Sequence, residues 1–425
     1  MFRFFRLSYL AFVLCLFAAS GCSSVGKQLL GDPENPYPLK SPPQIGQIVH
    51  LPTGTLVSPA QMQAMAGDVR IVYVGETHDN PASHRLELQV LQALAERHPG
   101  SQALGMEIFK RSQQPALDRW SAGKLDEKAF LKESRWFENW NMDFAYYRDL
   151  LNFARERHIP VIALDAEKDL VKAVRSKAPD QLTPPEQAQL PELDLADPYH
   201  RGLVTATFGD HSHGGLQLDG FVRAQVMRDE TMAESAVRYL TSPAGQDKHL
   251  LVVAGGDHVE NGFGIPRRVF RRFPASYTII GGKEINIPPD KRDRFMNVTI
   301  PDFPMVPYDF LVYQAYEDLP ETGVRLGVMV EVAPAGRGLV LKNMLHGSNA
   351  ERAGLQKGDL LLSFDGEALT ENLDLTYAVQ RKRQGDHAVM QVERQGKPVK
   401  VEVLFLTVQK DRPHDKQSPS SPIAK

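Results

Sequence analysis

The sequence predicts an α/β domain with a mainly parallel sheet flanked by helices, followed by a small β-rich domain. Over the first 300 residues, short segments rich in Val and Ile alternate with amphipathic helix patterns, which is typical of βαβ units. These predicted strands are apolar throughout, as expected where helices cover both faces of a sheet. Beyond residue 323, Val-rich segments instead alternate with Gly-containing turns.

The N-terminus has the features of a lipoprotein signal peptide. Arg3 and Arg6 precede a nearly unbroken apolar stretch from Leu7 to Ala19, which is too short for a stable membrane span. The residues up to Cys22 resemble the bacterial lipobox, although an ordinary signal peptide with an incidental Cys is the alternative. We therefore expect a signal peptide at 1–21, lipid attachment at Cys22 and a flexible tether at 22–44. Ser23, rather than Asp, after this Cys favours anchoring to the outer membrane, on its periplasmic or surface side.

Composition excludes several classes of site and partner. The only two cysteines are Cys15 and Cys22, so after processing no thiol remains for thiolate zinc sites, thiolate haem or cysteine catalysis. The formal net charge is −3 and the charged residues form no long run, so nucleic acid is not an expected partner.

The first domain is expected to span residues 45–300. Its predicted strands lie at 69–74, 102–106, 160–164, 249–254 and 277–280, and its predicted helices at 84–97, 112–122, 126–133, 145–157 and 221–240. A Pro-rich segment at 301–322 is interpreted as a linker, and the polar residues 409–425 as a disordered tail.

The segment 323–408 resembles a PDZ domain. The resemblance is carried by the run from Gly347 to Gly366, which combines a short helix, Ala-Gly-Leu, a Gly-Asp turn, a strand and an Asp-Gly turn. In that family a Gly-rich loop offers N–H groups to a peptide carboxylate, and the peptide adds as a strand, so a protein or peptide C-terminus is the implied partner. By position this loop is expected at Gly336, Arg337, Gly338 and Leu339. A groove that is covered, or that only docks on the neighbouring domain, is the alternative.

Two similar turns follow predicted strands of the first domain, at Gly75–His78 and Gly255–His258. In an open parallel sheet such turns lie at the carboxyl ends of strands, where binding sites form. Because a third acid, Glu107, also ends a predicted strand, we expect one crevice to contain Glu76, His78, Glu107 and His258. These side chains suit a divalent metal such as zinc or manganese, or metal-free acid/base chemistry. Alternatively they fix the turns structurally.

The same domain resembles the ChaN-like haem-binding lipoproteins, within a wider group that includes Tiki, TraB and erythromycin-esterase-like domains. The resemblance is carried by the segments 72–81, 103–109, 136–140, 159–164, 255–259 and 262–268. It implies a bacterial surface lipoprotein linked to iron acquisition, with haem bound through tyrosine between paired subunits, hence a homodimer. The wider group also contains hydrolases that use the same Glu and His positions, some with a divalent metal.

The haem ligand is not identified by any motif. Iron without a Cys ligand takes His, Met or Tyr, and Tyr199, Tyr146 and Tyr147 are candidates that ordinary packing would also explain. His211 and His213 form a further histidine cluster. The expected function is therefore a surface lipoprotein that binds haem or iron for uptake or handling, with a PDZ module recruiting a protein partner. A Glu/His-based hydrolase, with or without a metal, is the alternative.

Overall fold

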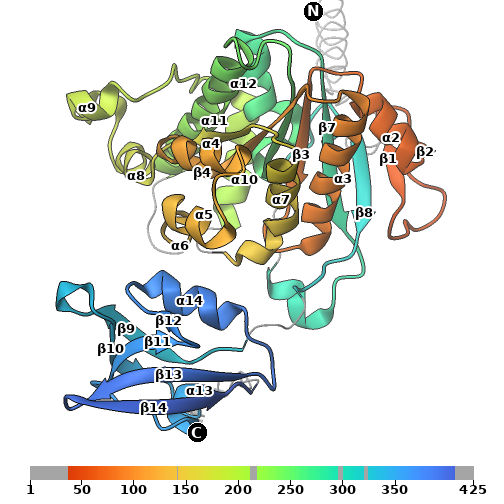
Figure 1. The fold of residues 1–425 in the computed structure, drawn as a ribbon. Helices are drawn as coiled ribbons and strands as arrows, with labels where there is room; N and C mark the ends of the chain where they lie inside the picture. Colours follow the sequence, from red (N-terminus) through yellow and green to blue (C-terminus); the bar gives the residue numbers. More distant parts are fainter. Residues whose placement is uncertain (1–36, 141, 211–217, 295–299, 320–323, 407–425) are drawn as a thin grey trace, which may run out of the picture.

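The computed structural model describes residues 37–140, 142–210, 218–294, 300–319 and 324–406. They form an eight-stranded sheet flanked by helices and a separate smaller sheet that begins after residue 324 (Figure 1). The predicted fold class is confirmed. In the described part of the chain, no helix combines the length and apolar character needed to cross a bilayer.

The large sheet has the strand order β2-β1-β8-β7-β3-β6-β4-β5. The six strands from β8 to β5 run parallel, and β1 and β2 form an antiparallel edge. In chain order the strands are β1 (Ile48–His50), β2 (Thr55–Val57), β3 (Ile71–Glu76), β4 (Gln102–Lys110), β5 (Val161–Asp165), β6 (His249–Gly255), β7 (Tyr277–Glu284) and β8 (Phe310–Gln314).

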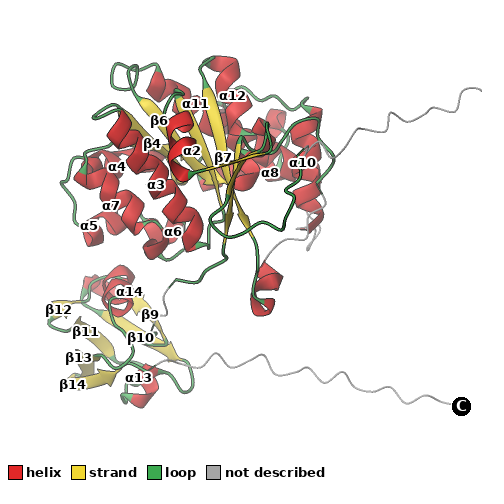
Figure 2. Cartoon of the chain, turned by 90° about the vertical axis from the view of Figure 1, so that its right-hand side faces the viewer, coloured by secondary structure: helices red, strands yellow, loops and turns green. Residues whose placement is uncertain are grey.

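Helices cover both faces of this sheet (Figure 2). One face carries α3 (Pro81–Arg97), α4 (Gln114–Ser121) and α7 (Arg148–Glu156), and the other carries α8 (Lys168–Ser176), α11 (Leu218–Leu240) and α12 (Ile265–Arg272). The remaining helices of this part are α2 (Pro59–Ala66), α5 (Glu127–Glu133), α6 (Trp136–Asn139), α9 (Pro184–Gln187) and α10 (Pro198–Asp210).

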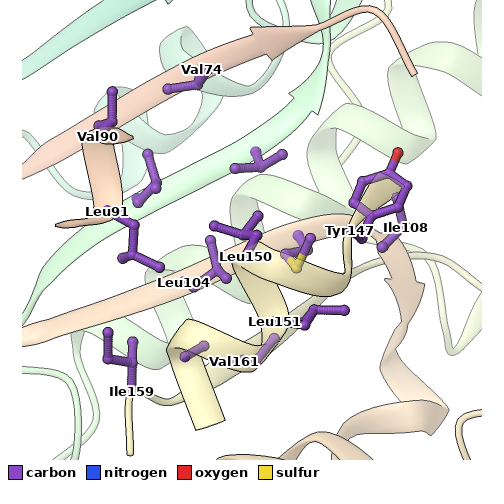
Figure 3. Close-up of a cluster of buried hydrophobic side chains, with 14 of the residues drawn as sticks. Val74, Val90, Leu91, Leu104, Ile108, Tyr147, Leu150, Leu151, Ile159 and Val161 are labelled. Carbon is purple, nitrogen blue, oxygen red and sulfur yellow. The ribbon is translucent and has the colours of Figure 1, made fainter. Parts of the chain in front are cut away.

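Strand β3 shows how alternation serves both faces. Val72 and Val74 join the core under α3 and α7, whereas Ile71 and Tyr73 join the core under α11 and α12. Figure 3 shows the first of these cores, where Val74 lies on the same side as side chains from the two helices. Because both faces of the strand are buried, polar residues cannot alternate with apolar ones, and this explains the continuous apolar run.

The segment predicted as a linker contains a strand of the large sheet. β8 pairs in parallel with β7 and antiparallel with β1, so the first domain continues beyond residue 300. Prolines at 304 and 307 precede this strand and obscure its pattern in the sequence. The edge strands β1 and β2, three residues each, and helices α8 and α10 are also absent from the predicted elements.

The smaller sheet has the order β14-β13-β11-β10-β9, with β12 paired to β11. Its elements are β9 (Val328–Val332), β10 (Leu339–Met344), α13 (Asn349–Arg352), β11 (Leu360–Phe364), β12 (Glu367–Ala368), α14 (Asn372–Gln380), β13 (His387–Arg394) and β14 (Lys397–Leu404). Its own core includes Leu339, Leu341 and Phe364. β9 lies at the edge of the sheet, and its other neighbour in space is α14.

Helix α14 also contacts the first domain (Figure 1). Lys128 of α5 pairs with Asp374 at 2.9 Å, and Lys132 pairs with Glu371 at 2.5 Å. Tyr377 packs against the core of the first domain beside these ion pairs. The helix that borders the open edge of the small sheet is therefore also the docking element.

Candidate functional site

The two Gly-x-x-His turns lie side by side at the carboxyl ends of neighbouring strands. Glu76 at the end of β3 is in register with Gly255 at the end of the adjacent strand β6. A side-chain carbon added at Gly255 would lie 3.2 Å from the His78 ring and 3.5 Å from Glu107 Oε2. The absence of a side chain at Gly255 thus lets the two turns and the end of β4 pack closely. The structure brings Glu76, His78, Glu107 and His258 together.

Glu107 is held by three donors. Its Oε2 accepts the Gly255 N–H at 2.7 Å, and its Oε1 accepts from Arg228 at 2.6 Å and lies 3.3 Å from His258 Nε2. Burial would raise the pKa of this carboxyl, but His258 and Arg228 together hold the pKa well below its usual value. Glu107 is therefore a permanent carboxylate whose oxygens are already occupied.

Arg228 of α11 joins the ends of two strands. Besides Glu107 it contacts Asp165 Oδ2 at 2.7 Å, and Asp165 also receives Lys110 Nζ at 2.5 Å. Asp165 directly follows the predicted strand 160–164, just as Glu107 directly follows the predicted strand 102–106. The sequence position of Asp165 could therefore have indicated a site residue. Arg228 had no such signal, because it lies within a long helix of mixed polarity.

His258 is buried among charged side chains. Its Nδ1 contacts Asp229 Oδ1 at 2.5 Å, and the other oxygen of Asp229 accepts from His200 at 2.7 Å. Burial lowers the pKa of His258, but Glu107 and Asp229 outweigh it and raise the pKa to about 10. Arg228 Nη1 also lies 3.1 Å from His258 Nε2, so both ring nitrogens already have protein partners. His258 is thus poorly suited to act as a general base or a metal ligand.

Glu76 belongs to a second, adjoining cluster. Its Oε1 contacts His78 Nδ1 at 2.5 Å and accepts the Tyr147 hydroxyl at 2.8 Å. Burial would raise the pKa of Glu76, but His78 and His84 lower it to about 2. Behind it, His84 and Glu87 of α3 are both buried. These two residues were not among the predicted site residues.

A pocket of about 400 Å³ opens beside the strand-end network, lined partly by Arg228 and Asp257. Four cationic side chains border it, namely those of Lys110, Lys168, Arg175 and Arg228. Apolar lining comes from Val171, Phe221 and Ala224 on α8 and α11. This combination of charge and apolar surface suits an amphipathic anion.

The three tyrosines predicted as haem ligands have different surroundings. Tyr199 on α10 is 45% exposed, and its ring stacks on Phe263 with centroids 5.4 Å apart. Tyr147 is fully buried, and burial together with Glu76 raises the pKa of its hydroxyl well above the usual value. Tyr146 is partly buried and tilts against the His84 ring at 5.5 Å. Because a tyrosinate must form to bind ferric iron, Tyr147 is the least suited of the three.

Other predicted positions lie elsewhere. Gly336 to Leu339 fall in the turn between β9 and β10, where Gly336 N–H donates to Ala333 O and Ala333 N–H donates to Gly338 O. Both edges of the following strand β10 are paired. Cys22, His211 and His213 lie outside the described residues.

Two parts of the chain match known protein families. Residues 62–269 match the family described as "Haem-binding uptake, Tiki superfamily, ChaN", and residues 324–405 match the PDZ domain family. No curated protein matches the chain.

Solved structures similar to the chain include three of relevance. The structure "Cofacial heme binding to ChaN of Campylobacter jejuni" is 14% identical, covers 64% of this chain and 98% of its own, and has a TM-score of 0.49. The HtrA-type protease AlgW with decapeptide is 23% identical over 20% of this chain and 29% of its own, with a TM-score of 0.19. The HtrA3 PDZ domain bound to a phage-derived ligand is 18% identical over 19% of this chain and 84% of its own, with a TM-score of 0.18.

Proposed function

We propose that the protein is a lipid-anchored bacterial surface protein that binds haem for iron uptake or handling. The proposal is supported by residues 62–269, which match the ChaN-like haem-binding family of the Tiki superfamily, and by residues 324–405, which match the PDZ domain family. In this proposal the PDZ domain recruits a protein partner through a peptide C-terminus. Cys22 is the proposed anchor, and the outer membrane is the proposed location.

The observation that supports haem most directly is the cation-lined pocket. A haem has an apolar face, which Phe221 and Val171 of the pocket could contact. It also has two carboxylates, which Lys168 and Arg175 could bind. Haem iron would take tyrosinate as a ligand in this thiol-free chain. Tyr199 is the candidate because its side chain is exposed; it does not line the pocket itself, but it lies on α10, whose Thr207 does. An exposed ligand also agrees with haem shared between two copies of the chain.

A haemin titration of the purified protein, followed by absorbance, tests this proposal. We expect a shifted Soret band that saturates, weaker binding in Lys168→Glu and Arg175→Glu, and a changed spectrum in Tyr199→Phe. Tyr37→Phe is the control for loss of an exposed tyrosine hydroxyl, because Tyr37 is 56% exposed and lies outside α10. A wild-type protein that leaves the haemin spectrum unchanged would refute the proposal. A Tyr199→Phe spectrum identical to the wild type would discard this ligand only.

The proposed peptide site is the open edge formed by β9. A peptide that adds to this edge as an antiparallel strand would place its C-terminal carboxylate beside residues 324–327, which precede β9. Gly327 has a φ of +79° there, which suits a turn whose N–H groups point at an anion. This replaces the turn at Gly336–Leu339 as the proposed carboxylate loop. Fluorescently labelled peptides from a random C-terminal library should bind with a free carboxylate and lose affinity as C-terminal amides.

The hydrolase alternative gains no support from the described residues. Both ring nitrogens of His258 contact Arg228 or Asp229, and both oxygens of Glu107 are engaged by the protein. A water-activating base would need a free lone pair at the crevice.

A further inference from the structure

Three buried side chains converge behind the end of β3. Glu76 ends the strand, and His84 and Glu87 lie three residues apart on the first turns of α3, so they share one face of that helix. The helix begins at Pro81, and the side chain of Asn80 caps it by accepting the Ala82 N–H at 3.1 Å. This start directs the face with His84 and Glu87 towards the strand end. Glu76 and His84 are each 5% exposed and Glu87 is fully buried.

The ligand-type atoms of these side chains have the spacing of a coordination shell. His84 Nδ1 lies 3.2 Å from Glu87 Oε2 and 3.4 Å from Glu76 Oε2. One nitrogen and two carboxylate oxygens lie within 4.8 Å of one another. For an ion bound at about 2.0–2.2 Å, neighbouring ligand atoms are roughly 3.0–3.6 Å apart. Small rotations of the side chains would therefore complete a shell.

Two oxygens of this cluster lack a donor. Glu76 Oε2 and Glu87 Oε1 are buried and have no hydrogen-bond partner. A buried acceptor without a partner costs about 1–3 kcal/mol, and more when the group is charged, so native proteins rarely leave two together. Burial lowers the pKa of His84, but Glu87 and Glu76 outweigh it and raise the pKa to about 9, so a dication would have to displace a proton from this ring. Once bound, it would satisfy both oxygens and balance both carboxylates.

Contacts around the cluster have the form expected of an outer shell. His84 Nε2 lies 3.0 Å from the carbonyl oxygen of His78, so an N–H there donates to the backbone and leaves the Nδ1 lone pair facing the carboxylates. The Tyr147 hydroxyl donates to the other oxygen of Glu76. Histidine and carboxylate ligands of metals are usually fixed by such partners.

We propose that Glu76, His84 and Glu87 form a binding site for one divalent transition-metal ion of the Zn²⁺ or Mn²⁺ type. The site would hold the end of β3 against the start of α3. It is distinct from the cation-lined pocket proposed for haem, and it replaces Glu107 and His258 as expected metal ligands, since Arg228 and Asp229 occupy those groups. His78, whose side chain is 36% exposed, contacts the other oxygen of Glu76 and is an outer neighbour of the site.

The rival explanation is a proton in place of the ion. Burial and the neighbouring Glu76 raise the pKa of Glu87 well above its usual value, so a protonated Glu87 could donate to Glu76. This arrangement would also remove both unsatisfied acceptors. The two explanations differ in whether the full-length protein binds a metal ion at this cluster.

The test is calorimetric titration of the full chain with Zn²⁺ and with Mn²⁺ after chelator treatment, supported by elemental analysis. We expect one equivalent to bind, and His84→Gln and Glu87→Gln to lower the affinity at least about 100-fold. His78→Gln, which removes only an outer contact, should cost about 10-fold or less. Co²⁺ provides a spectroscopic check, because its visible bands should change in His84→Gln and persist in His78→Gln.

Three outcomes would overturn the proposal. One is a wild-type protein that binds none of the three ions, which would favour the shared proton. Another is binding that survives His84→Gln but is lost in His78→Gln, which would move the ion to the crevice. The third is binding lost in His98→Gln, which would place the ion at the stacked rings of His98 and His249, 3.7 Å apart, instead. Circular dichroism of each variant establishes that it is folded before its affinity is compared.

Discussion

Replacement of Arg228 by Met should strongly destabilise the first domain. The guanidinium contacts Glu107 at 2.6 Å and Asp165 at 2.7 Å, and these carboxylates are only 3% and 0% exposed. Met has a similar reach and no charge, so the change leaves two buried carboxylates with one cation fewer. Removing one partner from a buried ion pair costs about 3–5 kcal/mol. Lys110 and His258 still compensate each carboxylate in part, so we expect a value near the lower end, about 3 kcal/mol.

Urea unfolding followed by tryptophan fluorescence provides the measurement, since all three tryptophans lie in the first domain. Arg238→Met is the control, because Arg238 lies on the same helix, is 62% exposed and, within the described part of the chain, pairs only with Glu234. Its loss should cost less than about 1 kcal/mol. Adding Glu107→Gln to Arg228→Met removes one uncompensated charge and should recover part of the loss. A cost below 1 kcal/mol for Arg228→Met, or a double variant that is no more stable, would contradict this account of the network.

Three further predictions concern titration, docking and packing. The pKa of His258 is raised from 6.5 to about 10, so protonated His258 should stabilise the fold fully below pH 6.5 and progressively less as the pH rises to 10. The free energy of unfolding should therefore fall over this range, and a flat profile would contradict the prediction. The double variant Lys128→Glu, Lys132→Glu should repel the acidic residues at α14 and separate the two domains. X-ray scattering should then give a larger radius of gyration, and an unchanged radius would argue against docking through these ion pairs. Gly255→Ala should cost about 1–3 kcal/mol in stability, because the added carbon meets the His78 ring at 3.2 Å; an unchanged melting temperature would show that the turns adjust.

Apolar continuity explains which strands could be predicted. β3 and β6 are buried on both faces, so their runs of Val, Leu and Ile stand out against the helices between them. β8 has the same buried role but only five residues, flanked by prolines on one side, and its pairing partners β7 and β1 are remote in sequence. A strand that depends on distant neighbours for its identity leaves little local pattern.

The candidate site divides in the same way. Glu76, Glu107 and His258 could be predicted because each follows an apolar run predicted as a strand, and parallel strands gather their carboxyl ends at one edge of the sheet. Arg228 and Asp229 could not, because their role depends on how α11 packs across those ends. Glu87 was missed for a related reason. An acid three residues from His84 on a helix is ordinary in sequence, and only burial beside β3 gives the pair its chemistry.

The carboxylates at the strand ends also determine which cationic side chains of the pocket remain available to bind an anionic ligand. Lys110 and Arg228 border the pocket, but Asp165 and Glu107 neutralise them. Arg175, by contrast, pairs with no carboxylate among the described residues, and its buried Nε has no hydrogen-bond partner there. Its guanidinium lies 5.5 Å from the centre of the Phe221 ring, which leaves its N–H edge for an acceptor. An anionic ligand would therefore gain most from Arg175. If replacing Lys110 or Arg228 weakened binding as much as replacing Arg175, the loss would instead reflect disruption of the buried ion-pair network.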